Sequence, residues 1–527
     1  MIDFIERLVT GPGLVRRGIT GWAPHGLGLV LVLALVALPM RFGMPSIVRA
    51  APSNSVTNLN DSGPGSLRQA IADAAPGDTI TFAVGGTILL SSGQLVVAKN
   101  LTLSGPGAAS LAISGNKANI ALASRVFSNS AHLTVTGLTI RDGDAGPGSG
   151  GGVLNASGGV LTIANSVVTG SQAQKGAGVF NSAGGQLQIA NSTFSANSTR
   201  PFDAGLDASG AGIYNAGVAN ITGSTFSFNN VHDHGSGLYN DATATVANST
   251  FSLGQSATAA LYNNGGALHL NNVTVTLNTG KRQANGLFAA AGSVTVANSL
   301  IAGNASISNP LPDCAGPIAS GGHNLIGNAT GCALSAGAGD LLGSEVAPIN
   351  ARLGPLTANG GPTSTHTLLV GSPAIDAGSP AAPGSGGSAC EAADQRGVGR
   401  PGFGATSLTC DIGAVEIGGP LPPTSTSTVT LTPLPPTSTA TATPTGTLTL
   451  PTSTPTATDT PLPPTSTATA TLTSTVTSPT STPTDTGTPL AATSTPTATG
   501  TQAVPTSTPT ATPVTPKWFL YLPVVLR

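Results

Sequence analysis

Between about residue 133 and residue 302, apolar and polar positions alternate in short runs that repeat along the chain. One run reads Gly-x-Gly-aliphatic-aromatic-Asn and occurs as GGGVLN, GAGVFN, GAGIYN and GSGLYN, which end at Asn155, Asn181, Asn215 and Asn240. The other reads aliphatic-x-aliphatic-Ala-Asn-Ser-Thr-Phe, as in LQIANSTF from Leu187. Because successive strand residues point to opposite faces, each run predicts a strand with one buried side. Two such strands in every 25 residues or so, repeated many times, predict a solenoid.

The parity of the positions predicts which side chains face the interior. The aliphatic residues, such as Val179 and Ile213, share their parity with the terminal asparagines and should point inward. The aromatic column then lies outside, and it consists of Phe180, Tyr214, Tyr239 and Tyr262. Stacked asparagines about 4.8 Å apart can hydrogen-bond along the stack. No apolar stripe with helical spacing is present, so the pattern predicts an all-β fold, a parallel β-helix.

The segment before the repeats predicts a cap for the first coil. Ser66, with Gln69 three residues later, is a helix-capping pattern that opens a short amphipathic helix ending at Pro76. Strands are expected at 79–84, 87–90 and 94–97. Residues 51–100 therefore form an N-terminal cap with the first strands, which protects the open end of the stack, and residues 101–312 form the coils.

Both ends of the chain have the composition of export and display segments. Residues 1–50 carry arginines before an apolar run, which predicts a signal peptide or, if it is not cleaved, an N-terminal membrane segment. Residues 419–516 are almost entirely Thr, Pro, Ser and Ala, which predicts a disordered stalk with hydroxyls open to glycosylation. Residues 517–527, KWFLYLPVVLR, resemble the YLP-x-V-x-R tails of some bacterial secreted proteins, which implies a hydrophobic sorting or anchor motif.

All four cysteines lie outside the repeats, and they form two sequential pairs. In an exported chain they favour two disulfides, and the simplest of three pairings joins Cys314 to Cys332 and Cys390 to Cys410. Their spacing fits no zinc motif.

Residues 313–418 do not follow the repeat, and they contain long motifs that are characteristic of one protein family. The pieces are GHNLIG (Gly322 to Gly327), LGPLTANGGPTSTHTLLVGSPAIDAG (Leu353 to Gly378), DQRGVGRP (Asp394 to Pro401) and CDIGAVE (Cys410 to Glu416). They resemble the choice-of-anchor Q family of bacterial surface proteins, and the repeats are similar to those of polymorphic outer membrane proteins. The resemblance implies an exported, right-handed, pectin-lyase-like β-helix, with an irregular disulfide-bearing C-terminal cap at 313–418 and an anchoring device that varies between members. It implies no catalytic residue set.

The late acidic residues belong to turn motifs of this resemblance, with Arg396 and Arg400 as structural partners. They are Asp340, Asp376, Asp394 and Asp411.

Charge is scarce, and this restricts the possible partners. Charged residues make up 8% of the chain and the net charge is −2, so hydroxyls and amides must form the exterior. A nucleic-acid partner would need a basic stripe, which the chain lacks. The expected location is secreted, at the cell surface or anchored in the cell envelope, with the membrane reached through the N-terminal segment or the C-terminal tail.

One constellation of charged residues could support catalysis. The insertion that contains Arg200, Asp203 and Asp207 precedes a coil with His232, Asp233 and His234, followed by Asp241. These groups could converge, since they are one coil apart, and a strand would place both histidines on one face. Polysaccharide lyases and hydrolases need such carboxylates, although a polar loop beside a solvated corner would give the same pattern.

Two further patterns suggest binding. Asp142 and Asp144 alternate with glycine as in part of a calcium loop, but the remaining oxygen ligands are absent and a plain turn explains them better. No other cofactor is expected. The aromatic column could serve as a platform for sugars or as a packing ladder.

The sequence is compatible with two functions. The first is an exported, non-catalytic surface protein that acts in adhesion, cell contact or envelope structure, with the cell envelope or extracellular glycans as partners. The alternative is a carbohydrate-active β-helix, either a polysaccharide lyase or hydrolase or a glycan-binding module.

Overall fold

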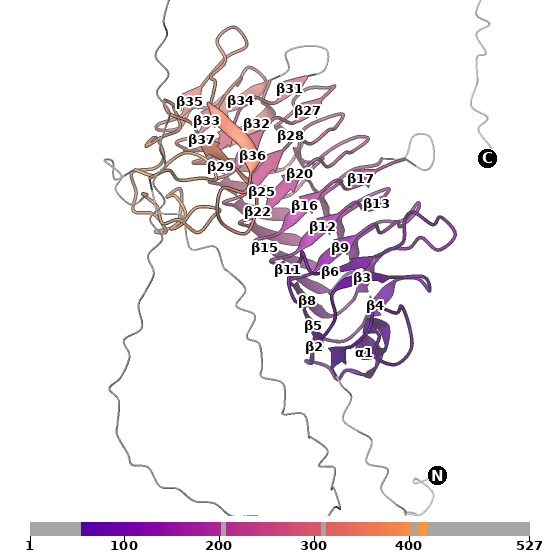
Figure 1. Cartoon of the computed structure of the whole chain (residues 1–527). Coiled ribbons are helices and arrows are strands. Elements are labelled where there is room, and N and C mark those ends of the chain that lie inside the picture. The colour runs from indigo at the N-terminus through magenta and orange to yellow at the C-terminus, as the bar shows by residue number, and fades with distance from the viewer. Residues whose placement is uncertain (1–53, 202–206, 307–311, 403–408, 419–527) are drawn as a thin grey trace, which may run out of the picture. The chain divides into compact units, whose positions relative to one another are not determined.

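The repeats form a right-handed parallel β-helix (Figure 1), as the sequence predicts. The computed structural model describes residues 54–201, 207–306, 312–402 and 409–418. The expected signal peptide or membrane segment (1–50), stalk (419–516) and anchor motif (517–527) lie outside these residues, as does Asp203.

Each coil contributes one strand to each of three parallel sheets, which we name A, B and C. In one coil these are β11 (Val160–Ala164) in sheet A, β12 (Val167–Thr169) in sheet B and β14 (Val179–Asn181) in sheet C. A short strand, β13 (Gln172–Ala173), lies between sheets B and C and pairs with β17 (Ser198–Thr199). Further along, β27 (Thr279–Gly280) pairs with β31 (Ala305–Ser306) in the same way.

The remaining strands follow the same order along the chain. Sheet A also contains β1 (Ser55–Val56), β2 (Thr79–Phe82), β5 (Leu101–Ser104), β8 (His132–Thr136), β15 (Gln186–Ala190), β19 (Val218–Thr222), β22 (Thr243–Ala247), β25 (Ala267–Asn271) and β29 (Ser293–Ala297). Sheet B contains β3 (Gly86–Leu89), β6 (Leu111–Ser114), β9 (Thr139–Arg141), β16 (Thr193–Ser195), β20 (Thr225–Ser227), β23 (Thr250–Ser252), β26 (Thr274–Thr276), β30 (Leu300–Ile301), β33 (Leu325–Ile326) and β35 (Leu341–Leu342). Sheet C contains β4 (Leu95–Val97), β7 (Phe127–Asn129), β10 (Val153–Asn155), β18 (Ile213–Asn215), β21 (Leu238–Asn240), β24 (Leu261–Asn263) and β28 (Leu287–Ala289).

The Ala-Asn-Ser-Thr-Phe run is the corner between sheets A and B. Ala190 ends β15, and Asn191 turns the chain with a φ of 49°, a left-handed conformation that asparagine tolerates better than most residues. Ser192 is buried, and its Oγ accepts a hydrogen bond of 3.2 Å from the backbone N–H of the equivalent serine one coil earlier. Phe194 then points into the core and stacks on Phe226, with 4.9 Å between ring centroids. The motif therefore combines a corner, a polar ladder and a core stack.

The asparagines at the ends of the sheet C strands form the predicted ladder. Each side-chain amide donates to the Oδ1 of the next asparagine over 2.7 to 2.8 Å, through Asn129, Asn155, Asn181, Asn215, Asn240 and Asn263. All six side chains are buried. Because an unsatisfied buried amide is costly, the ladder fixes the register of one coil on the next.

The N-terminal end of the stack is capped as expected. Helix α1 (Leu67–Asp73) buries Leu67 and Ile71 in the same core cluster as the first strands, and Ser66 Oγ accepts the backbone N–H of Gln69. The Gln69 side chain bonds Asp73 and not the cap.

The C-terminal region differs from the expected cap. The coils continue beyond residue 312, because β32 (Cys314–Gly322) and β34 (Cys332–Ser335) extend sheet A and β35 is the last strand of sheet B. The chain after Leu342, which we call the return segment (343–418), then folds back along sheet B.

The return segment is held against the outer side of sheet B by polar contacts. It contains a hairpin of β36 (Leu353–Thr357) and β37 (Thr365–Leu368). Thr225 Oγ1 donates to the Ser364 carbonyl over 2.6 Å, and Ser252 Oγ lies 2.9 Å from His366 Nε2. The sequence repeats do not predict this contact, because the return segment itself contains no repeat.

Both predicted disulfides, Cys314–Cys332 and Cys390–Cys410, are present. Such bonds are typical of oxidising compartments. Within the described ranges, no helix has the length and apolar character needed to cross a membrane.

Candidate functional site

Of the predicted charged constellation, Asp207 and Asp233 meet at one corner, whereas Arg200 lies 3.5 Å from Asp144. Asp207 Oδ2 lies 3.1 Å from Lys175 Nζ, and Asp207 Oδ1 accepts a hydrogen bond of 2.5 Å from Ser209 Oγ. Asp233 accepts the backbone N–H of Ala208 over 2.8 Å. Asp207 therefore ties the insertion to the preceding coil, and Asp233 ties it to the next coil.

The two histidines of this corner do not share a face, contrary to the prediction. His232 lies in a bend, its side chain is 56% exposed, and its Nδ1 is 3.0 Å from Asp233 Oδ1. His234 is half-buried and stacks on Tyr262 with 4.4 Å between centroids. Burial lowers the pKa of His234, although Asp207 and Asp233 act in the opposite direction. His234 is thus largely neutral at neutral pH and packs as an aromatic ring.

The aromatic column forms a ladder whose ring faces are already occupied. Ring centroids are 5.0 Å apart between Phe180 and Tyr214, 4.6 Å between Tyr214 and Tyr239, and 5.2 Å between Tyr239 and Tyr262. The three tyrosines are at most 8% exposed. A sugar ring could therefore reach only the edges of these rings.

The hydroxyl end of the tyrosine ladder is tied to the charged corner. Tyr214 Oη donates to the Asp241 carboxylate, and Lys175 Nζ lies 5.1 Å from the centre of the Tyr214 ring. Burial, together with the neighbouring carboxylates, raises the pKa values of Tyr214, Tyr239 and Tyr262. The hydroxyls are therefore hydrogen-bond donors and not proton acceptors at physiological pH.

Asp142 and Asp144 occupy two corner columns of the solenoid. Asp142 has a φ of 51° and pairs with Arg141 over 2.6 Å. Asp144 accepts the Gly146 N–H and lies 3.5 Å from Arg200. In the described part of the chain, no three His, Cys, Asp or Glu side chains are grouped so as to hold a metal ion. The arrangement is that of a turn with two ion pairs.

A pocket of about 370 Å³ opens beside the charged corner. It contains both charged and amide side chains, and its polar lining includes Asn230, His232, Asp233, Gln255, Thr279, Lys281 and Arg282. The sequence did not indicate this pocket, because its residues come from three coils and share no motif.

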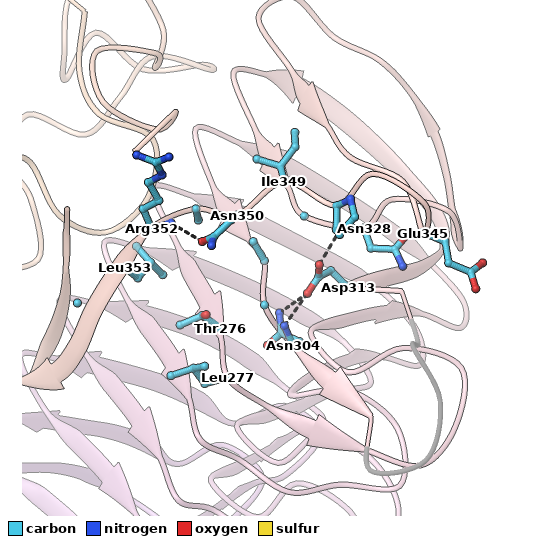
Figure 2. Close-up of a pocket in the computed structure, with 16 residues that line it drawn as sticks. Thr276, Leu277, Asn304, Asp313, Asn328, Glu345, Ile349, Asn350, Arg352 and Leu353 are labelled. Carbon is cyan, nitrogen blue, oxygen red and sulfur yellow. Dashed lines mark hydrogen bonds between the residues drawn. The ribbon is translucent and has the colours of Figure 1, made fainter. Parts of the chain in front are cut away.

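A second pocket, of about 440 Å³, lies between the last coils and the return segment (Figure 2). Asp313 lies between Asn304 and Asn328, accepting from Asn304 Nδ2 over 2.9 Å and from the Asn328 N–H over 2.8 Å. Burial raises the pKa of Asp313, although these hydrogen bonds lower it. Leu277 and Leu353 supply apolar walls.

Asp313 is also the end of a second polar ladder, which follows sheet B. Asn197 donates to Asn229, and Asn278 donates to Asn304, over 3.1 and 2.9 Å. The buried carboxylate of Asp313 accepts from the last asparagine of this series. Its role in the structure is therefore to complete the ladder.

The arginines of the return segment form a buried clasp, in line with the structural role implied by the resemblance. Arg396 lies 2.8 Å from Asp394, and Arg400 Nη1 lies 2.9 Å from Glu416 Oε2. Burial and the Glu416 charge raise the pKa of Asp411 to about 7, against hydrogen bonds from the backbone of Asp376 and Ile417.

Comparisons with known proteins support the β-helix class. The family model described as "Right handed beta helix region" matches residues 126–306, from β7 to β31. The chain is 39% identical over 120 residues to a protein of Neosartorya fischeri named probable pectate lyase C, a match that covers 22% of this chain and 26% of that protein. The chain thus spans about a quarter of the length of this curated relative.

Two solved structures are similar at low identity. The pectate lyase Pel9A matches with a TM-score of 0.40 and 13% identity, over 69% of this chain and 96% of that chain. A mutant of the PL6 family alginate lyase AlyGC matches with a TM-score of 0.20 and 12% identity, over 55% of this chain and 53% of that chain.

Proposed function

We propose that this chain is an exported, non-catalytic β-helix that acts at the cell surface in adhesion, cell contact or envelope structure. The observation that carries the proposal is the state of the corner carboxylates. Asp207, Asp233 and Asp241 are each engaged by a neighbouring group, namely Lys175, the Ala208 N–H and the Tyr214 hydroxyl. Acid–base cleavage of a glycosidic bond needs carboxyl groups placed around a substrate, and these three instead support the fold.

The outer face of sheet A supports the same proposal. From β2 to β29 its strands contain no Lys, Arg, Asp or Glu. Its outward positions carry mainly Thr, Ser, Gln, Asn and Ala, together with Val160 and Val218, and the titratable groups on them are His132 and His269. A surface of this kind suits contact with other molecules better than proton transfer.

Surface display is the part of the proposal that rests on the sequence outside the described ranges. The apolar segment in 1–50, the Thr/Pro-rich segment 419–516 and the terminal motif 517–527 are arranged as export signal, stalk and anchor. Protease treatment of intact cells tests it: the β-helix should be cleaved from the surface while a cytoplasmic marker stays intact. Recovery of the whole chain from inside the cell would contradict it.

A polysaccharide lyase or hydrolase is the alternative function. It is favoured by the pocket that brings His232 and Asp233 close to Lys281 and Arg282, and by the similarity to the probable pectate lyase C of N. fischeri. The test is to incubate the purified protein with uronic-acid polysaccharides, with and without Ca²⁺, and to follow unsaturated and reducing ends. Turnover that disappears in Asp233→Asn and Asp207→Asn would establish the enzyme and overturn the non-catalytic proposal.

A further inference from the structure

Three successive coils carry large apolar residues at one strained corner. Phe228, Leu253 and Leu277 follow the strands β20, β23 and β26, and their φ angles are 55°, 59° and 57°. We call these three residues the corner ridge. The same corner holds Gly170 two coils before the ridge and Gly303 in the coil after it, with φ angles of 66° and 72°.

The corner ridge is unfavourable for the fold in two ways. A left-handed backbone crowds the Cβ atom of any residue other than glycine, and bulky residues rarely adopt it. Phe228 is also 59% exposed and Leu277 is 45% exposed. Strained positions and exposed apolar groups concentrate at functional sites, so the ridge is a candidate contact surface.

A polar column runs beside the ridge in the same register. Asn230, Gln255 and Thr279 each lie two residues after a ridge residue, and their backbones pair from coil to coil. Within the described chain, the side-chain amides of Asn230 and Gln255 form no hydrogen bond, and both residues are exposed. All three residues line the pocket of about 370 Å³.

Two cations at this pocket lack partners. Lys281 and Arg282 are exposed, and across the described ranges neither forms an ion pair or a side-chain hydrogen bond. The pocket's own carboxylate, Asp233, is already engaged by His232 and by the Ala208 N–H. The charge still available to a ligand is therefore positive.

We propose that the corner ridge, the polar column and the adjoining pocket bind an extended anionic polysaccharide that runs along the solenoid axis. Equivalent residues recur at the strand spacing, about 4.8 Å, so one apolar group and one polar side chain are offered at each step. The C–H faces of sugar rings pack on aromatic and aliphatic groups, while the amides bond the hydroxyls. Carboxylate or sulfate groups pair with Lys281 and Arg282.

Beyond the last residue of the corner ridge there is space for the polysaccharide to continue. After Leu277 the corner is Gly303, and both residues line the pocket shown in Figure 2. Arg352 lies at the rim of that pocket, on the side away from Glu345. An extended peptide fits less well, because peptides that lie along sheets use free backbone edges, and the strands before this corner are paired on both sides.

The test uses the full-length protein and affinity electrophoresis in gels that contain alginate, chondroitin sulfate or dextran. The two anionic polymers probe carboxylates and sulfates, and neutral dextran is the control polymer. We expect retardation by at least one anionic polymer and none by dextran. Phe228→Ala with Leu277→Ala should weaken binding about tenfold or more, and Lys281→Ala with Arg282→Ala should also remove most of its salt dependence.

Two controls separate binding from folding. Val218→Ala removes an apolar group that is 46% exposed on sheet A, and it should bind like the wild type. Phe228→Gly relieves the positive φ, so it should keep or raise the thermal midpoint while weakening binding. Equal binding by wild type and ridge variants, equal retardation by dextran, or no retardation by any polymer would each overturn the proposal. Because the assay uses purified protein, its outcome is independent of surface display.

Discussion

Asn155 and Asn181 are joined by a hydrogen bond of 2.7 Å between side-chain amides that lie 26 residues apart in sequence and one coil apart in space. Both side chains are buried, and each also bonds backbone carbonyls of its own turn and of the next coil. The stack is therefore held by polar groups as well as by its apolar core, and this leads to the first prediction.

Asn181→Ala should lower the free energy of unfolding by about 2 to 4 kcal/mol. The change removes the partner of Asn155 and Asn215 and leaves a small cavity in a buried polar ladder. Chemical denaturation followed by circular dichroism measures it. Gln188→Ala is the matched control, because Gln188 is exposed on β15, and it should change the free energy by less than about 0.5 kcal/mol.

Removal of the Cys390–Cys410 disulfide should loosen the return segment and leave the coils intact. The bond closes a ring across 20 residues of that segment, and such a ring is worth about 3 kcal/mol through the entropy of the unfolded chain. Limited proteolysis of Cys390→Ser/Cys410→Ser should cleave faster within 353–418 than in the wild type. Equally fast cleavage between residues 133 and 302 would contradict the local effect.

The N-terminal cap should weaken in acid. Burial alone would raise the pKa of Asp61, but hydrogen bonds from Ser92, Arg68 and Ser91 lower it to about 2, from an ordinary 3.8. A lowered pKa stabilises the fold fully above pH 3.8, and this contribution is lost as the pH falls through 2. Hydrogen exchange in α1, corrected for the pH dependence of the intrinsic exchange rate, should therefore accelerate between pH 4 and pH 2.

In Asp61→Asn the exchange in α1 should already be faster at pH 4, and it should change little on further acidification. A variant that keeps the wild-type pH dependence would show that another group is responsible.

The return segment should respond to pH in the opposite direction. Burial and the Glu416 charge raise the pKa of Asp411 from 3.8 to about 7. A raised pKa stabilises the fold fully below pH 3.8, and the contribution is lost as the pH rises through 7. Protease cleavage within 353–418 should therefore be slower at pH 5 than at pH 8.

Asp411→Asn removes the titrating group while keeping the shape of the side chain. Its cleavage rate, corrected for the pH dependence of the protease on an unfolded substrate, should be nearly the same at both pH values. A difference as large as in the wild type would assign the effect to another group.

The features that were predictable from the sequence are those that depend on a local residue pattern or on the repeat length of the coils. The Asn155–Asn181 ladder followed from parity and spacing, and α1 followed from Ser66 and Gln69. The return segment was not foreseen, because contacts such as Ser252 with His366 join positions more than a hundred residues apart and no repeat connects them.

The candidate site was foreseen in part. The proximity of Asp207 and Asp233 follows from their being one coil apart, whereas His234 turned to pack on Tyr262 because the chain there is a bend and not a strand. The corner ridge has a weak signal: a bulky residue stands where other coils place a small or polar residue, namely Asp142, Gly170, Ala196 and Gly303. It becomes visible only when the coils are aligned by structure.

The carboxylate of Asp313 limits where a β-helix of this kind can gain coils during evolution. An asparagine both accepts and donates, so a duplicated coil inserted inside the stack finds a partner above and below. The carboxylate oxygens of Asp313 accept hydrogen bonds from Asn304 and Asn328, and unlike an amide this side chain has no N–H group to donate to a further coil. Asp340 ends the other polar ladder, that of the corner serines such as Ser192, because it accepts from Asn324, which in turn accepts from the Ser299 N–H. Duplicated coils can therefore be inserted within the solenoid but not added at its C-terminal end. The number of coils can change while the end next to the return segment stays the same.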